Sequence, residues 1–157
     1  MNIGIILHSQ TGNTYFVGQK IEEKLKAKGH NVTLIRIQTK DAANKNEKDI
    51  QLDCMPDVDG YDALVFGGWI QAFNLYPGVA MYLNQLHSLA DKKVTCFLTQ
   101  HFRYKWMGGT IGLFKMKKIL ASKGATVLTA EIINWSDENK RPKQIVELVE
   151  NISRQYD

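Results

Sequence analysis

The sequence predicts an α/β protein with a doubly wound, five-stranded parallel sheet and helices on both of its faces. Five short apolar runs alternate with amphipathic stretches, and strands that alternate with helices form parallel sheets. The runs are nearly continuous rather than apolar at every second position, as expected of strands buried on both faces. They comprise residues 3–7, 32–37, 63–67, 94–98 and 125–133.

The stretch after each run carries helix signals. Val17, Ile21 and Leu25 recur at helical spacing, and Gly29 follows as a typical residue beyond a helix C-terminus. Similar patterns predict helices that begin near Pro77, after the glycine pair 108–109, and near Pro142. The polar segment 39–60 is long for a loop, so we expect a short helix around residues 50–52.

Length and composition indicate one globular domain, residues 1–157. The hydrophobic fraction of 44% and the charged fraction of 23% are those of an ordinary folded protein, which argues against disorder. The apolar runs are too short for a bilayer, and no basic segment precedes an apolar one at the start, so we expect a cytoplasmic protein. Cys54 and Cys96 lack ligand spacing, so no metal site is expected.

Positive charge is concentrated in one part of the chain. The net charge is +4, yet no Asp or Glu occurs between Lys92 and Ala130. This stretch is either a solvated basic helix face or a site for anionic partners. Nucleic acid is not the expected partner, because no DNA-recognition helix and no RNA-binding motif accompanies the positive charge. The basic residues are Lys92, Lys93, Arg103, Lys105, Lys115, Lys117, Lys118 and Lys123.

The turn after the first strand has the composition of an anion site. Its hydroxyls and backbone N–H groups gather where the first helix begins, and free N–H groups and the helix dipole favour an anion there. The turn contains no Lys or Arg, and neither the GxxxxGK[ST] nor the GxGxxG motif is present. A single phosphate monoester therefore fits best, and the alternative is an ordinary helix cap with a solvated turn. The residues are Ser9, Gln10, Thr11, Gly12, Asn13 and Thr14.

This turn resembles the FMN-phosphate loop of the flavodoxin family, [ST]-x-T-G-x-[ST]. The segment 61–68 is similar to that family's third strand and glycine turn. The pair Gly108–Gly109 is similar to the third flavin loop of flavodoxin-like quinone reductases. The resemblance spans nearly the whole chain and implies a short-chain, flavodoxin-like electron-transfer protein with non-covalent FMN.

The resemblance further implies that the isoalloxazine ring lies between the loops after the third and fourth long strands. Both loops are rich in aromatic side chains, which stack well on a flat ring. Trp69 is the first choice for such a contact. His101 is a weak candidate for a proton donor, and the alternative is a merely exposed loop histidine. The expected ring-site residues are Gly68, Trp69, Gln71, Phe73, Gln100, His101, Tyr104, Trp106, Gly108 and Gly109.

The chain departs from the acidic carriers that it resembles, because it places Arg103 and Lys105 in the third flavin loop. Positive charge favours an anionic hydroquinone, so we expect a less reducing flavin than in acidic relatives. A basic rim suits an acidic redox partner protein or a small anionic molecule, such as the phosphates of NAD(P)H.

Two other functions remain open at the level of sequence. One is an NAD(P)H-dependent flavin oxidoreductase that reduces a quinone or another small acceptor. The other is a flavin-free doubly wound binding module, such as a response-regulator-like receiver. A receiver needs acids after the first and third strands, where this chain has His8–Ser9 and Gly67–Gly68. Neither function involves a membrane as partner.

Overall fold

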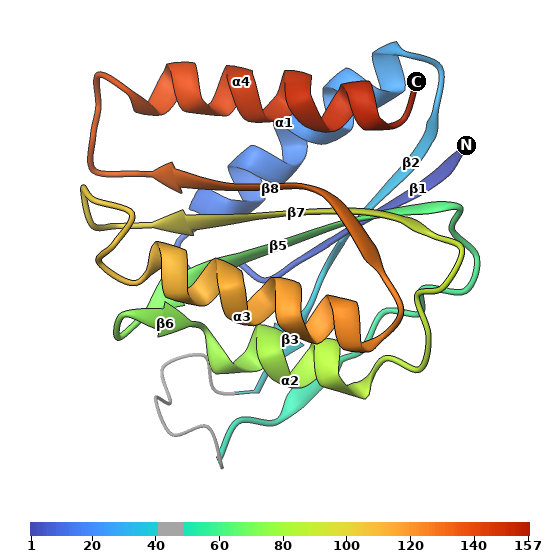
Figure 1. The fold of residues 1–157 in the computed structure, drawn as a ribbon, viewed down its shortest axis with the longest axis horizontal. Helices are drawn as coiled ribbons and strands as arrows, with labels where there is room; N and C mark the ends of the chain where they lie inside the picture. The colour runs from blue at the N-terminus through green and yellow to red at the C-terminus, as the bar shows by residue number, and fades with distance from the viewer. Residues whose placement is uncertain (41–48) are drawn as a thin grey trace.

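A mostly parallel β-sheet forms the central layer of the computed structural model, which describes residues 1–40 and 49–157 (Figure 1). The strand order is β2-β1-β5-β7-β8, and every neighbouring pair on this path is parallel. The predicted five-stranded parallel sheet is therefore confirmed. The strands are β1 (Asn2–Leu7), β2 (Asn31–Arg36), β5 (Ala63–Gln71), β7 (Lys93–Gln100) and β8 (Thr126–Asn134).

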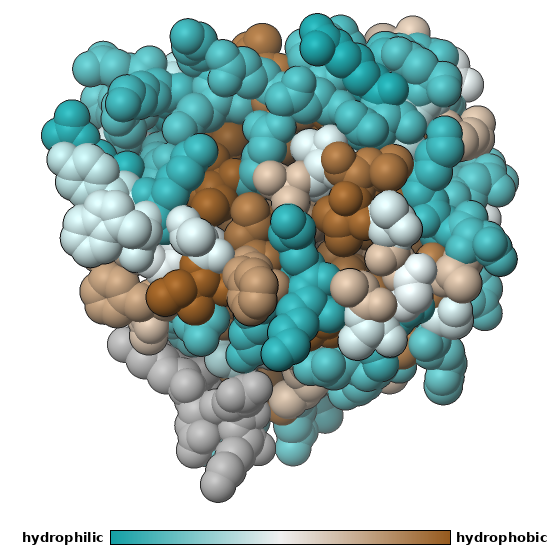
Figure 2. All heavy atoms as spheres, viewed as in Figure 1, coloured by the Kyte–Doolittle hydropathy of each residue, from teal (hydrophilic) through white to brown (hydrophobic). Residues whose placement is uncertain are grey.

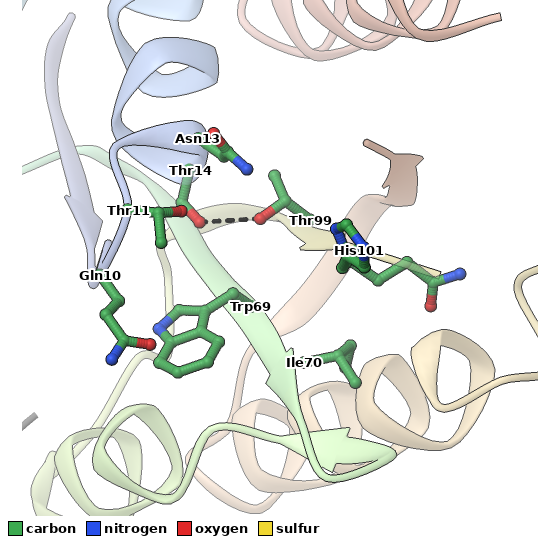
Figure 3. Close-up of a pocket in the computed structure, with 9 residues that line it drawn as sticks. Gln10, Thr11, Asn13, Thr14, Trp69, Ile70, Thr99 and His101 are labelled. Atoms are coloured by element: carbon green, nitrogen blue, oxygen red, sulfur yellow. Dashed lines mark hydrogen bonds between the residues drawn. The ribbon is translucent and has the colours of Figure 1, made fainter. Parts of the chain in front are cut away.

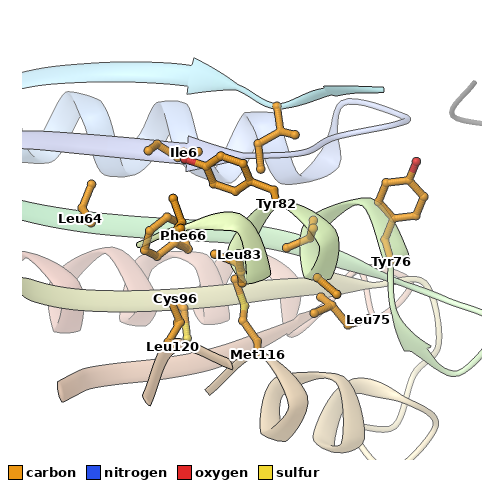
Figure 4. Close-up of a cluster of buried hydrophobic side chains, with 14 of the residues drawn as sticks. Ile6, Leu64, Phe66, Leu75, Tyr76, Tyr82, Leu83, Cys96, Met116 and Leu120 are labelled. Atoms are coloured by element: carbon orange, nitrogen blue, oxygen red, sulfur yellow. The ribbon is translucent and has the colours of Figure 1, made fainter. Parts of the chain in front are cut away.

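Two helices cover each face of the sheet (Figure 1). One pair is α1 (Asn13–Ala27) with α4 (Arg141–Gln155), and the other is α2 (Pro77–Gln85) with α3 (Gly109–Ser122). Val17, Ile21 and Leu148 belong to the buried cluster on the first side. The cluster on the second side includes Leu83 and Met116 (Figure 4). Burial of these apolar side chains is the main free-energy source that fixes both layers.

The segment around residues 50–52 is a correction to the sequence prediction. The structure contains a short strand, β4 (Leu52–Cys54), which pairs antiparallel with β3 (Gln38–Thr39). Ile50 is buried, Gln51 is exposed and Leu52 is half-buried, so the side chains alternate as in a strand rather than a helix. Residues 41–48 of the same segment lie outside the described part.

The third long strand extends further than its apolar run. β5 continues past Gly67 to Gln71 and turns back into β6 (Asn74–Leu75), which pairs antiparallel with it. The carboxyl ends of β1, β5 and β7 meet at one edge, the usual ligand edge of doubly wound sheets. Among the helices that the structure describes, none has the length and apolar character needed to cross a membrane.

Candidate functional site

A pocket of about 390 Å³ opens at the carboxyl ends of β1, β5 and β7 (Figure 3). Three segments supply its walls: the turn between β1 and α1, the end of β5, and the end of β7 with the residue that follows. Its lining residues are Gln10, Thr11, Asn13, Thr14, Trp69, Ile70, Thr99, Gln100 and His101.

The turn between β1 and α1 presents unused backbone donors to this pocket. Gly12 precedes the helix with φ of +94°, a conformation that glycine adopts without strain. The Ser9 hydroxyl accepts a hydrogen bond from the Tyr15 amide at 3.2 Å and so holds the turn closed. Within the described residues, the amides of residues 10–14 have no hydrogen-bond acceptor. Such a nest of N–H groups at a helix N-terminus favours an anion.

Thr14 connects the turn to the strand beyond it. Its hydroxyl shares a hydrogen bond with that of Thr99 at 2.9 Å (Figure 3). The carbonyl of Gly68 lies 3.5 Å from the same oxygen. Thr99 was not predicted from the sequence, although a threonine at the end of an apolar strand was a usable signal. This link fixes the turn against two strand ends and preorganises the pocket.

Trp69 forms one wall of the pocket, and a hydrogen bond to His8 fixes its indole ring. The indole Nε1 donates a hydrogen bond to His8 Nδ1 at 2.9 Å. The indole also stacks on Tyr76, with ring centroids 4.5 Å apart and planes 17° apart. His8 Nε2 lies 3.2 Å from the Thr39 hydroxyl, which in turn shares a hydrogen bond with the Tyr76 hydroxyl at 3.2 Å. Three side chains, His8, Tyr76 and Thr39, thus fix the plane of the indole.

The protonation state of His8 follows from this environment. Burial, and secondarily the positive charge of Arg36, lowers the pKa of His8 to about 4. The ring is therefore neutral near pH 7. Because Nδ1 accepts the indole hydrogen bond, the single proton lies on Nε2 and points to Thr39. This geometry gives His8, at the end of β1, a partner in the pocket wall.

Gln100 organises the loop after β7. Its Nε2 donates to the backbone carbonyls of Phe102 and Tyr104, at 3.1 and 2.7 Å. Its Oε1 is buried and lacks a hydrogen-bond partner among the described residues. Gly109 makes room for this oxygen, since a Cβ there would lie 2.3 Å from it. The Gln100 side chain thus joins the loop after β7 to the start of α3.

The turn between β5 and β6 carries strained backbone beside the pocket. Ala72 and Phe73 have φ of +50° and +63°, in the region that non-glycine residues avoid. Phe73 stacks on Phe102 at 4.9 Å, with planes 10° apart. Gly108 lies tightly behind it, because a Cβ there would be 2.7 Å from the Phe73 Cα. Phe73 therefore packs against the neighbouring loop instead of lining the pocket.

The structure brings together part of the predicted site. Gln10, Thr11, Asn13, Thr14, Trp69, Gln100 and His101 line the pocket, and Ser9 and Gly12 shape its turn. Pocket residues that the sequence reasoning missed are Ile70 and Thr99. The remaining predicted residues do not line it; they are Gly68, Gln71, Phe73, Tyr104, Trp106, Gly108 and Gly109.

Three pairs of these residues lie elsewhere, each for a different reason. Gly68, expected in an open turn, lies inside the paired region of β5 opposite Leu98, and Gln71 pairs with Asn74 in the β5–β6 turn. Tyr104 and Trp106 stack on each other at 6.0 Å and are exposed. Gly108 and Gly109 act through close packing at the start of α3.

Cationic side chains lie around the site but not in its turn. Arg36 donates to the Ser9 carbonyl at 3.0 Å, so it supports the turn from outside. Arg103 lies 4.0 Å from the carboxylate of Asp137, and Lys105 is exposed. Cys96 is fully buried, and burial raises its pKa to about 12.

The chain matches no protein-family model, but its fold matches solved structures. Flavodoxin 1 from Bacillus cereus superposes with a TM-score of 0.70 at 14% identity, over 99% of this chain and 97% of that one. A flavoprotein from Lactobacillus acidophilus, solved in complex with FMN, gives 0.63 at 16% identity over 91% and 97%. Two-electron reduced flavodoxin from Megasphaera elsdenii gives 0.59 at 23% identity over 97% and 98%. These likenesses establish a shared fold.

Proposed function

We propose that this chain, whose fold is flavodoxin-like, binds FMN non-covalently and transfers electrons through it. The observation that carries the proposal is a turn of free backbone donors at the start of α1 that opens into the same pocket as the fixed indole of Trp69. A phosphate monoester fits the turn, and a flat aromatic ring fits the indole. The flavodoxin and FMN-flavoprotein structures with this fold support the same reading.

Each part of the pocket has a role in this proposal. The amides of residues 10–14, with the Thr11 and Thr14 hydroxyls, would hold the phosphate. Trp69 would stack on the ring, and Gln100 would hold the loop after β7 beside it through its bonds to the Phe102 and Tyr104 carbonyls. The bound flavin would supply the redox chemistry. The chain's own residues orient the ring and keep water from one of its sides.

An enzymatic variant of this function is favoured by one observation, the presence of His101 in the pocket wall. His101 is exposed and could deliver a proton to a small acceptor, such as a quinone, that is reduced at the expense of NAD(P)H. Rapid NAD(P)H oxidation with a quinone, without a separate reductase, would identify this variant. Slow turnover that a His101→Gln substitution leaves unchanged would favour the carrier.

Calorimetry with FMN and with riboflavin tests the proposed binding. We expect the purified chain to bind FMN with a flavin absorbance spectrum, and riboflavin at least about 100-fold more weakly, because riboflavin lacks the phosphate and its charge-assisted hydrogen bonds. Thr11→Val should weaken FMN about tenfold and leave riboflavin unchanged, since it removes one pocket hydroxyl that takes no part in the Thr14–Thr99 hydrogen bond. Thr110→Val is the control, because that hydroxyl bonds to Lys105 outside the pocket. Equal affinities for the two flavins, or no binding, would refute the proposal.

A further inference from the structure

Large apolar side chains are exposed beside the pocket, on α3 and on the loop before it. Trp106 is 71% exposed, Phe114 68%, Ile111 58% and Tyr104 52%. Figure 2 shows apolar and aromatic side chains gathered at the left, over the β5–β6 turn and the first turns of α3. Exposed apolar surface of this kind marks a place where another molecule docks.

The arrangement on α3 is a continuous stripe. Ile111, Phe114, Lys115 and Lys118 follow the i, i+3, i+4, i+7 spacing of one helix face. Met116 and other residues of the opposite face are fully buried against the sheet. We call the stripe, together with Tyr104, Lys105 and Trp106, the α3 face. The stripe therefore places Ile111 and Phe114 beside Lys115 and Lys118.

The charge of the α3 face has a single sign. No Asp or Glu occurs between Lys92 and Ala130. Lys105, Lys115 and Lys118 form no ion pair in the part of the chain that the structure describes. Arg103, at the edge, faces Asp137 at 4.0 Å. These cations retain their full attraction for an anionic surface.

We infer that the α3 face is the docking surface for an acidic redox protein, whose carboxylates surround a small apolar centre. The inference rests on the proposed FMN function. Trp, Tyr and Arg are the side chains that most often dominate protein interfaces, and rim cations select an oppositely charged partner. A second copy of this chain is disfavoured as occupant, because it would bring like charges together.

The α3 face is directly connected to the pocket. Gln100, a pocket residue, donates to the Tyr104 carbonyl at 2.7 Å. The Thr110 amide donates to the Lys105 carbonyl at 2.9 Å and ties the loop to the start of α3. A protein seated on this face therefore lies next to the pocket, which shortens the path of an electron to a bound flavin.

Electron transfer from a reduced plant-type ferredoxin tests the inference. This acidic protein has a low potential, so its cluster loses one electron and the oxidised flavin gains it. We expect the second-order rate constant to fall with ionic strength, and to fall at least tenfold in Lys115→Glu/Lys118→Glu. The control Lys20→Glu/Lys143→Glu makes the same change of net charge on α1 and α4 and should leave it within twofold. Equal rate constants for the two charge variants would overturn the inference.

A second experiment separates this surface from flavin binding. In the FMN-free protein labelled with ¹⁵N, the Trp106 indole resonance should shift when oxidised ferredoxin is added, and Ile111→Ser/Phe114→Ser should abolish the shift. Phe16→Ser/Val146→Ser, two exposed apolar residues on another face, should not. If the protein binds FMN but the Trp106 resonance does not shift, the docking inference is overturned and the proposed FMN binding is not. Self-association, or binding only to phosphatidylglycerol vesicles, would also overturn it.

Discussion

At the scale of single residues, His8 shows how a buried polar group is tied to the pocket. Its two nitrogens serve Trp69 and Thr39, and its ring lies 4.5 Å from that of Tyr76. A protonated ring would lose the Nδ1 acceptor and leave the indole N–H facing another donor. The fixed indole therefore depends on a neutral His8.

Acid should destabilise the protein through His8. Its folded pKa of about 4 lies below the ordinary 6.5, so the unfolded chain binds a proton that the folded chain excludes. The contribution is fully present above pH 6.5 and is lost as the pH falls from 6.5 to 4, by about 2–3 kcal/mol in the free energy of unfolding. Urea unfolding across this range should show the loss.

The matched variant for this prediction is His8→Gln. Its side-chain oxygen can still accept from the Trp69 indole, but it does not titrate. The free energy of unfolding of the native protein, relative to that of His8→Gln, should therefore fall as the pH falls. Parallel pH profiles would show that His8 does not contribute to the acid sensitivity.

At the scale of secondary-structure elements, the β5–β6 turn contrasts with the turn before α1. The turn before α1 has Gly12 at its position of positive φ, whereas the β5–β6 turn has Ala72 and Phe73 at such positions. A two-residue hairpin turn favours Asn and Gly at such positions. Stacking of Phe73 on Phe102 holds the strained turn and joins it to the loop after β7.

Ala72→Gly should raise the free energy of unfolding by about 0.5–1 kcal/mol, because glycine adopts the positive φ without strain. Thermal and urea unfolding measure the change. Ala80→Gly provides the opposite sign, since Ala80 is buried inside α2 and glycine there loses helix propensity and packing. A loss of stability in Ala72→Gly would mean that the turn is not strained.

At the scale of the whole molecule, the charge distribution sets both the partner and the flavin potential. The basic stretch between Lys92 and Ala130 includes the loop after β7 and the outer side of α3. A unit charge about 10 Å from the ring contributes roughly 0.4–1.7 kcal/mol at an effective dielectric of about 20–80. The cations of this stretch therefore favour an anionic reduced flavin.

Arg103→Glu/Lys105→Glu should lower the potential at which the flavin hydroquinone forms. Each unit of charge corresponds to about 20–70 mV for a one-electron couple, and Asp137 already offsets part of Arg103. The double variant removes four units of positive charge, so potentiometry should show a fall of about 80 mV or more. Lys20→Glu/Lys143→Glu, with the same net charge, should change the potential less. An unchanged potential in the first variant would contradict the electrostatic account.

The sequence by itself determined the layered architecture and the turn after the first strand. Both are local properties: apolar runs of strand length require burial on two faces, and residues 9–14 adjoin one another along the chain. The tertiary structure alone decided which distant side chains meet. Thr14 and Thr99 are 85 positions apart, and His8 and Trp69 are 61 apart. Their contacts depend on strand register and side-chain packing, as does the placement of Phe73, Tyr104 and Trp106 outside the pocket, and no local pattern encodes these.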